Sequence, residues 1–496
     1  MEWKITKEPL ESLATDAIIV FHSQGGESVQ GYARKVDKAL DYRISSLISE
    51  GEITGELGEI TILHNWGKIP SGRVIISGLG KEDRADLGRL KHAVAVAARK
   101  AQKLGLKQLG LGCPSFLIER YNSVDVVQAI VEGVELGTYQ HQSYKSEQKK
   151  KEIETVWLFV ESISESAVQA GIERGQVFAR ATNFARFLVH EPGNYLTPEK
   201  LAFHAKRIAE KRELSIDILT KEQLVEQGMH ALLAVSGGSA NPPRMIVLSY
   251  QGAPESREIL GLVGKGVTFD SGGLQIKPSS SMNGMKGDMA GAAAVLGAMD
   301  AIGKLKPHCN VLAVIPACEN MTGDHAYRPG DVIRTYSGKT IEVHHTDAEG
   351  RIVLADAIAY AKRLGATKLV DVATLTGAVI VALGYEASGL MTNHEAWGNE
   401  VKTAARIVGE RVWELPMFDE YEEYVKSEIA DVKNDAGAPA GSIQGGMFLK
   451  HFAGDTPWVH LDIAGTAESK KEHGIHLKGA TGAMVRTLVQ LAIRFA

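Results

Sequence analysis

Two short stretches of this chain place acidic and basic side chains at spacings that suit metal-ion chemistry. The first is the run His345-Thr346-Asp347-Ala348-Glu349-Gly350-Arg351, in which two carboxylates stand two residues apart and an arginine follows. Two carboxylates held this close repel one another unless a positive charge lies between them. A metal ion is the simplest such charge, so Asp347 and Glu349 are candidate metal ligands.

The residues on either side of this run predict where it lies. Residues 340–344 predict a strand, and residues 352–360 predict a helix with an apolar face. Asp347 and Glu349 are therefore expected at the carboxyl end of a strand, just before a helix. In open α/β sheets, ligands bind at this edge.

The second stretch extends from Gly264 to Asp288 and follows an apolar strand predicted over residues 259–263. It contains Lys265, Asp270, Lys277 and Asp288 among several glycines. Glycine allows the backbone to fold tightly around a small ion or to approach a substrate closely. Surface ion pairs would explain any one of these acids alone, but the combined pattern favours a metal site with additional cations.

These two stretches resemble the M17 leucyl aminopeptidases. The resemblance rests on GKGVTFDSGG at 264–273, Lys277-Pro278, MKGD at 285–288, TDAEGR at 346–351 and DVATLTGA at 371–378. It covers roughly residues 175–496 well and the preceding residues loosely. It implies a dinuclear-metal aminopeptidase that releases Leu-like, neutral or apolar N-terminal residues from short peptides.

The resemblance also implies the metal ligands. Asp270 and Glu349 would bridge two divalent ions, Asp347 would complete one site, and Lys265 with Asp288 would complete the other. Carboxylate ligation suits Zn²⁺, Mn²⁺ or Co²⁺, and two such ions activate a bridging water and polarise a carbonyl. A ligating lysine must be neutral, so the pKa of Lys265 would have to fall far below ~10.4.

Lys277 and Arg351 are the catalytic residues that the resemblance implies. Lys277 would polarise the substrate carbonyl and stabilise the tetrahedral oxyanion as a fixed positive charge. Arg351 would hold a bicarbonate ion that takes and returns a proton. The sequence also supports a simpler alternative, in which Arg351 binds substrate directly.

Four positions match the family's pocket for the first substrate side chain, namely Met285, Thr374, Leu375 and Gly377. An apolar pocket with a methionine suits Leu-like or Met-like side chains, although core packing would explain Met285 and Leu375 taken alone. One position departs from the family pattern, because His345 stands where the family usually has asparagine. We expect His345 to shape the leaving-group side of the pocket or to pack at the strand end, with metal ligation as the alternative.

The order of apolar runs predicts an α/β fold with two domains, each a mostly parallel or mixed sheet flanked by helices. We predict an accessory N-terminal domain over residues 1–165, a linker helix over 166–190 and a catalytic domain over 191–496. The first domain shows no acid or histidine cluster that can be tied to chemistry. The chain has no P-loop pattern, no G-x-S-x-G elbow and no HExxH motif.

Composition narrows the setting in which the protein acts. Its three cysteines form no CxxC pair, which favours reduced thiols in the cytoplasm. No secretory signal is evident, and no stretch approaches the ~20 apolar residues of a membrane span. The resemblance implies a homohexamer with active sites facing an interior space, which would restrict substrates to short peptides.

A second hypothesis is a nucleic-acid-binding regulator that acts through the N-terminal domain, a role known for some members of the family. It can coexist with peptidase activity. A net charge of −5 argues against general polyanion binding but does not exclude a local basic patch. The lysine-rich run 145–152 has no interleaved aromatic residues and reads most simply as a solvated loop or helix face. A catalytically dead scaffold is a third hypothesis, against which the intact set of ligands and cations argues.

Overall fold

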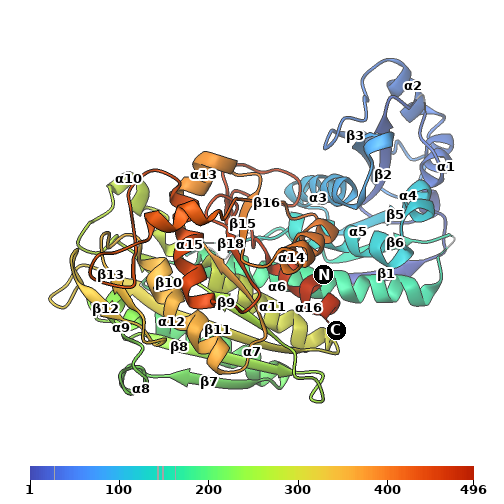
Figure 1. Ribbon diagram of the computed structural model, residues 1–496. Coiled ribbons are helices and arrows are strands. Elements are labelled where there is room, and N and C mark those ends of the chain that lie inside the picture. The colour runs from blue at the N-terminus through green and yellow to red at the C-terminus, as the bar shows by residue number, and fades with distance from the viewer. Residues whose placement is uncertain (27, 142–143, 148–149, 162, 496) are drawn as a thin grey trace. The chain divides into compact units, whose positions relative to one another are not determined.

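The computed structural model describes the chain except for residues 27, 142–143, 148–149, 162 and 496. Residues 148–149 of the lysine-rich run therefore lie outside the described residues. The chain forms two compact units (Figure 1). Unit 1 contains Met1–Arg180 and Lys470–Lys478, and unit 2 contains Ala181–Ser469 and Gly479–Ala496. Each unit has a sheet flanked by helices, so the predicted two-domain α/β class is confirmed.

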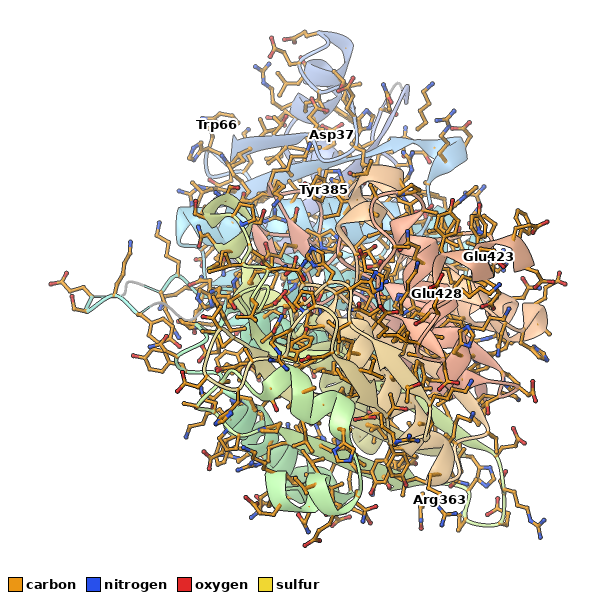
Figure 2. All side chains as sticks on the ribbon, turned by 60° about the vertical axis from the view of Figure 1, so that its left-hand side comes forward. Asp37, Trp66, Arg363, Tyr385, Glu423 and Glu428 are labelled. Carbon is orange, nitrogen blue, oxygen red and sulfur yellow. The ribbon has the colours of Figure 1, made fainter. Side chains whose placement is uncertain are left out.

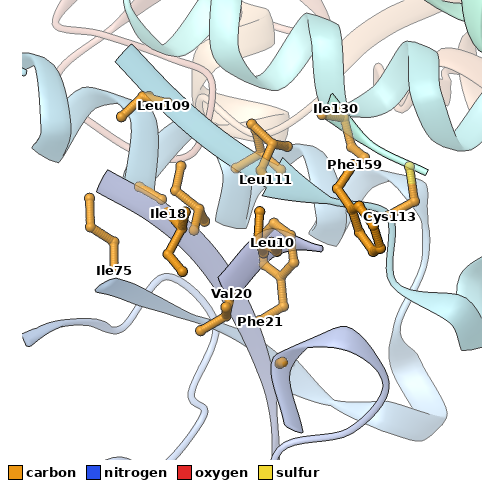
Figure 3. Packing of buried hydrophobic residues seen from close by; sticks show 14 of the residues in the cluster. Leu10, Ile18, Val20, Phe21, Ile75, Leu109, Leu111, Cys113, Ile130 and Phe159 are labelled. Carbon is orange, nitrogen blue, oxygen red and sulfur yellow. The ribbon is translucent and has the colours of Figure 1, made fainter. Parts of the chain in front are cut away.

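Unit 1 is built on a six-stranded sheet. Its strand order is β1 (Glu2–Thr6), β6 (Thr155–Phe159), β5 (Gln108–Gly112), β2 (Ala17–Gln24), β4 (Arg73–Lys81) and β3 (Ile60–His64). All neighbouring pairs are parallel except β3 with β4. Figure 3 shows the apolar packing on this sheet, where Ile18 of β2, Ile75 of β4 and Leu109 of β5 lie in one core cluster.

The helices of unit 1 are α1 (Tyr32–Ala39), α2 (Arg43–Ser49), α3 (Leu87–Leu104), α4 (Ser115–Arg120) and α5 (Ser123–Gly137). Helix α3 is rich in alanine, which has the highest helix propensity. The side chain of Asp86 caps its first turn by accepting a 2.7 Å hydrogen bond from the N–H of Arg89. Gly105 ends it at a φ of 79°, a left-handed conformation that favours glycine. Helix α6 (Glu165–His190) follows β6.

Residues 470–478 pack within unit 1 although they come from near the end of the chain. Glu472 forms an ion pair of 2.6 Å with Lys103 of α3. The ring of His473 stands edge-on to that of His92, with centroids 4.7 Å apart. The guanidinium of Arg99 donates to the carbonyl oxygen of Gly474. This late segment therefore contacts α3 at three successive residues.

Unit 2 contains a nine-stranded mixed sheet. Its path is β16 (Val412–Glu414), β15 (Ser388–Thr392), β18 (Trp458–Asp462), β14 (Lys368–Ala373), β9 (Ile259–Gly264), β11 (Asn310–Asn320), β8 (Arg244–Gln251) and β7 (Ser215–Leu219), with β10 (Gly266–Asp270) paired to β11. The central strands β18, β14, β9 and β11 are parallel to one another. Their carboxyl ends therefore lie at one edge of the sheet, where ligands bind in such folds.

Helices pack on this sheet in two groups. Helix α11 (Ala290–Leu305) contacts α7 (Pro198–Arg212) and α16 (Val485–Phe495), whereas α12 (Glu349–Arg363) contacts α9 (His230–Ser236) and α15 (Gly441–Ala453). Both α11 and α12 pack on β9 and β14. The shorter helices are α8 (Lys221–Glu226), α10 (Ser279–Met282) and α13 (Gly377–Leu383), and α14 (Glu395–Val408) packs on α16. At the surface of unit 2, charged side chains such as Arg363, Glu423 and Glu428 are exposed (Figure 2).

Two small sheets complete unit 2. One joins β12 (Val332–Arg334), β13 (Thr340–Glu342) and β17 (Val432–Lys433), and the other joins β19 (Glu468–Ser469) and β20 (Gly479–Ala480). The strand predicted over 340–344 is thus shorter than expected and belongs to the small sheet. A contact with a residue distant in the sequence accounts for the shorter strand. The amides of His344 and His345 donate to the side chain of Asn434 and not to a neighbouring strand.

The structure also bears on the expected state of the cysteines and on the expected lack of a membrane span. The three cysteines are buried and unpaired. Across the part of the chain that the structure describes, no helix combines the length and apolar character that crossing a bilayer would require.

Candidate functional site

The two acidic stretches meet in unit 2. Lys265 stands between β9 and β10, Asp270 ends β10, and Glu349 begins α12. Lys277 precedes α10, and Asp288 follows the short 3₁₀ turn Met285–Gly287. The structure brings six predicted residues into direct or shared contact, namely Lys265, Asp270, Lys277, Asp288, Asp347 and Glu349.

Lys265 joins the two stretches at one end of this cluster. Its Nζ lies 2.7 Å from Asp288 Oδ2 and 2.7 Å from Glu349 Oε1. It also donates a 3.0 Å hydrogen bond to the carbonyl oxygen of Thr374 at the end of β14. Lys265 is 2% exposed, so this charge is held almost entirely by protein groups.

Lys277 joins the stretches at the other end. Its Nζ lies 2.8 Å from Asp270 Oδ2 and 2.5 Å from Asp347 Oδ1. The second oxygen of Asp270 accepts hydrogen bonds from the N–H of Gly272 at 2.9 Å and from Asn320 Nδ2 at 2.8 Å. Hydrogen bonds therefore hold Asp270 Oδ1 in place, while Oδ2 faces the cluster.

The carboxylates converge in a way that suits cations. One ligand atom each from Asp270, Asp347 and Glu349 lies within 4.8 Å of the others. Among the described residues, the buried oxygens Asp288 Oδ2, Asp347 Oδ1 and Glu349 Oε1 have lysine ammonium groups as their partners. Buried carboxylate oxygens are costly unless they are paired or bind metal. The ammonium groups of Lys265 and Lys277 supply the positive charge at these oxygens, and the donor set fits divalent ions.

The electrostatics of the cluster follow from burial and mutual repulsion. Burial, together with the charges of Asp270 and Glu349, raises the pKa of Asp347 to about 7, while Lys277 opposes this shift. Burial alone would lower the pKa of Lys265, but the surrounding carboxylates outweigh it and raise that pKa above its usual range. Lys265 therefore carries its proton here, and only added positive charge at the carboxylates would lower its pKa.

Glycine is required where the two stretches touch. A Cβ placed on Gly350 would lie 2.6 Å from Cε of Lys265 and 2.7 Å from its Nζ. Gly272 has a φ of +89°, and a Cβ there would lie 3.0 Å from Asp347 Oδ1. A side chain at either position would displace a charged group of the cluster.

Sequence reasoning did not find the residues that hold the loop around Thr346. Asn320 Nδ2 and the Tyr327 hydroxyl both donate to the carbonyl oxygen of Thr346, at 3.0 and 2.5 Å. Gln275 Oε1 accepts from the N–H of Thr346 at 2.6 Å. These residues come from distant parts of the chain and form no local pattern. Asn320 alone could have been noticed, because it is a polar residue at the end of an apolar strand.

Asn434 is a second residue that the sequence did not reveal. Its buried side chain accepts from the amides of His344 and His345 and donates to the carbonyl oxygen of His345 at 2.6 Å. Its own carbonyl oxygen accepts a 2.6 Å hydrogen bond from Nη1 of Arg351. Arg351 is 5% exposed, and its Nε is buried with no hydrogen-bond partner among the described residues. Burial lowers the pKa of this guanidinium.

The predicted pocket residues lie along the neighbouring loops. Thr374 Oγ1 donates to Asp288 Oδ1 at 2.7 Å, and the N–H of Leu375 donates to Asp462 Oδ1 at 3.2 Å. Met285 is half-buried in the turn before Asp288. Gly377 is exposed at the start of α13. Only Thr374 of these four has a side-chain hydrogen bond to one of the clustered acids among the described residues.

His345 lies beside the cluster. Its Nδ1 accepts a 3.1 Å hydrogen bond from the N–H of Asp347, so this nitrogen is used in the turn that presents the carboxylate. The neighbouring His344 is directed to Glu342, with Nε2 and Oε1 2.9 Å apart.

Known proteins resemble the whole chain. A probable cytosol aminopeptidase of Alkaliphilus metalliredigens (strain QYMF) is 46% identical over 496 residues, covering 99% of both chains. Among solved structures, a mutant of tomato leucine aminopeptidase matches with a TM-score of 0.90 and 33% identity, covering 100% of this chain and 96% of that one. The bottromycin maturation enzyme BotP in complex with Mn matches with a TM-score of 0.84 and 32% identity, covering 97% and 99%.

The fold, the lysine–carboxylate cluster and these matches define a metal-dependent aminopeptidase. The chain belongs to the cytosol aminopeptidase family, M17. The profile of that family's catalytic domain matches residues 183–489, and the profile of its N-terminal domain matches residues 17–148. The resemblance read from the sequence motifs is thereby confirmed.

Proposed function

We propose that this protein releases Leu-like, neutral or apolar N-terminal residues from short peptides with two divalent ions held in unit 2. The observation that carries the proposal is the convergence of buried and half-buried carboxylates from Asp270, Asp347 and Glu349, whose charge is balanced by two lysine ammonium groups. The ligands would be Asp270 and Glu349 for both ions, Asp347 for one, and Lys265 with Asp288 for the other. Mn²⁺ or Zn²⁺, or alternatively Co²⁺, suits these donors.

When bound, the ions would supply a water of lowered pKa and polarise the scissile carbonyl. Side chains of the protein have to place positive charge next to the reacting carbonyl. Lys277 is 13% exposed at its side chain and reaches Asp270 and Asp347. A fixed ammonium at this place is suited to stabilise an oxyanion that develops on the substrate.

Arg351 is suited to hold a small anion beside the cluster. One of its nitrogens is committed to the carbonyl oxygen of Asn434, and its buried Nε has no partner among the described side chains and backbone groups. A bicarbonate ion would accept from such a donor and could take and return the proton of the attacking water. Direct binding of substrate by Arg351 is the alternative, and dependence of kcat on added bicarbonate distinguishes the two.

Specificity would come from two features. A free α-amine can ligate a metal ion, and an acylated amine cannot, which favours peptides with an unblocked N-terminus. Met285, Thr374, Leu375 and Gly377 would line the pocket for the first side chain. Thr374 links this pocket to the metal ligands through Asp288.

The test is hydrolysis of leucine amide by chelator-stripped protein, before and after addition of Mn²⁺ or Zn²⁺. We expect activity to return with metal for leucine amide and not for N-acetyl-leucine amide. Lysine amide, assayed in parallel, should be cleaved more slowly. Folded protein that stays inactive with every metal would contradict the proposal, and equal cleavage of the acetylated substrate would contradict the exopeptidase assignment.

The homohexamer, the cytoplasmic location and a nucleic-acid role of unit 1 stay predictions. Light scattering on the purified protein tests the first, and cell fractionation tests the second. Salt-dependent retention on immobilised DNA tests the third, because contacts to phosphates weaken steeply as salt rises.

A further inference from the structure

The loop between Lys277 and Asp288 contains an asparagine that is directly followed by a glycine, Asn283-Gly284. No other asparagine of the chain is followed by glycine. An asparagine before glycine loses its side-chain amide more readily than other asparagines do. The reason is that glycine has no side chain to hinder attack by its own main-chain nitrogen. The surroundings of Asn283 decide whether the folded protein prevents this reaction.

Asn283 and Gly284 belong to neither of the helical elements that flank them. Helix α10 ends at Met282, and the 3₁₀ turn begins at Met285 (Figure 1). Asn283 is exposed, and its side chain forms no hydrogen bond with any described residue. Neither burial nor a hydrogen bond therefore holds its amide group away from the backbone.

The backbone at Gly284 has room to move. Its φ is +135°, and no heavy atom lies within 4 Å of the place where a Cβ would stand. For the asparagine side chain to meet the next main-chain nitrogen, the peptide plane between the two residues has to rotate from the observed ψ of 95° at Asn283. Glycine adopts most combinations of φ and ψ at little cost, so this rotation is accessible in the folded protein.

The chain on either side of this pair is held by main-chain hydrogen bonds. In the turn that precedes Asn283, the N–H of Met282 donates to the carbonyl oxygen of Pro278 at 3.0 Å. In the turn that follows, the N–H of Gly287 donates to the carbonyl oxygen of Gly284 at 2.8 Å. A change in the backbone at residue 283 would therefore shift the two turns relative to one another.

We infer that Asn283 is a modification site, at which the folded protein converts itself to an aspartyl or isoaspartyl form. The main-chain nitrogen of Gly284 attacks the side-chain carbonyl carbon of Asn283 and closes a succinimide ring. The C–N bond of the side-chain amide breaks, and ammonia leaves with the proton of the attacking amide. Water then opens the ring at one carbonyl or the other, so water is the only co-reactant.

Both products change the loop between Lys277 and Asp288. Each adds a negative charge, and isoaspartate also routes the main chain through the former side chain, which lengthens the backbone by a carbon atom. Lys277 lies 2.8 Å from Asp270, and Asp288 lies 2.7 Å from Lys265, so a shift of the loop disturbs the lysine–carboxylate cluster. The fall in activity that we expect rests on the proposed function, whereas the chemical change at Asn283 does not.

Mass spectrometry of the tryptic peptide 266–286 from aged full-length protein tests the inference. The protein is kept in mildly alkaline buffer with chelator, and a second sample is unfolded in urea. The internal reference is Asn399, which is also exposed but lies in helix α14 before Glu400. We expect folded protein to deamidate at Asn283 at least about tenfold faster than at Asn399, and within about tenfold of the rate in urea. A rate at Asn283 no higher than that at Asn399 would overturn the inference.

The variant Asn283→Gln isolates the effect of the modification on activity. Glutamine keeps the amide but would have to close a larger ring, which is much slower. With Mn²⁺ restored after ageing, the variant should keep its initial kcat/KM for leucine amide. Wild type should lose activity in step with conversion, by about tenfold or more when conversion is complete, because small misplacements of active-site groups have effects of this size.

Full activity in completely converted wild type would overturn the expected effect on the cluster. Equal loss of activity in Asn283→Gln would show that another ageing process is responsible, and it would overturn that effect too. Protein that is inactive before ageing would contradict the proposed function instead. The mass spectra would still decide whether Asn283 is a modification site.

Discussion

Arg351 and Asn434 are joined by a 2.6 Å hydrogen bond from the guanidinium Nη1 to the main-chain carbonyl oxygen. The side chain of the same asparagine holds the backbone of His344 and His345, which precede the carboxylate of Asp347. One buried residue thus positions both the arginine and the loop that carries Asp347, a proposed metal ligand.

Asn434→Ala should lower kcat at least tenfold with little change in KM. The variant keeps the carbonyl that Arg351 binds but leaves two partly buried amides of the loop without an acceptor, so the free energy of unfolding should also fall by about 1–3 kcal/mol. Steady-state kinetics and urea unfolding measure the two effects. Asn393→Ala is the matched control, because Asn393 also binds backbone, at Gly454 and Thr456, away from the cluster. Asn393→Ala should lose stability without a fall in kcat. A fully active Asn434→Ala enzyme would contradict the positioning role of Asn434.

Lys277→Met should lower kcat/KM by about 10²–10³, which is the usual cost of removing one donor to an oxyanion. The metal content of the protein, measured by mass spectrometry, should stay the same, because Lys277 is not among the proposed ligands. Lys402→Met removes a lysine from an exposed pair with Glu414 and should be silent. A parallel loss of metal from Lys277→Met would instead show that this lysine supports ion binding.

Lys265→Met should have a different effect, one that is visible without substrate. In chelator, the substitution leaves Asp288 and Glu349 buried without their shared cation, and the free energy of unfolding should fall by about 3–5 kcal/mol. Lys211→Met removes a largely exposed partner of Asp300 and should change stability by about 0–1 kcal/mol. Equal stabilities of the two variants in urea would rule out a central role for Lys265 in balancing the carboxylates.

Asp356 should make stability depend on pH. Its carboxylate in α12 accepts from the amides of Tyr336 and Leu232 at 2.8 and 3.0 Å, yet burial raises its pKa to about 7. Between about pH 4 and pH 7 the folded protein binds this proton and the unfolded chain does not. The stabilisation of the folded state by protonated Asp356 is therefore complete below about pH 4. It is lost as pH rises through about 7.

Urea unfolding of wild type and Asp356→Asn across this range tests that prediction. The difference in unfolding free energy between the two should fall as pH rises, with a slope of up to about 1.4 kcal/mol per pH unit. A difference that is constant from pH 4.5 to 7.5 would show that Asp356 keeps its ordinary pKa.

The sequence was most informative where structure is locally determined. Helix α3 is an example, because its N-cap Asp86, its alanine-rich run and its terminal Gly105 all lie within or next to its own residues. The residues of the two acidic stretches could be found because a metal site needs particular side chains at short spacing. They converge around β9, β10 and the start of α12, whereas the strand predicted just before Asp347 belongs to the small sheet of β12, β13 and β17.

The parts that could not be predicted depend on contacts between distant residues. Asn320 and Asn434 carry common turn-forming side chains, and nothing near them in the sequence distinguishes a loop-holding asparagine. The strand before the acidic run ends at Glu342, and the side chain of Asn434 binds the amides of His344 and His345 that follow it.

The packing of residues 470–478 on α3 affects the order in which the protein can be completed during synthesis. A ribosome makes the sheet of unit 1 first, but the partner of Lys103 emerges only after nearly all of unit 2 has been translated. During synthesis, that side of α3 therefore stays uncovered until residues 470–478 have been made. For the same reason, a fragment that stops at residue 180 would lack the segment 470–478 that packs on α3.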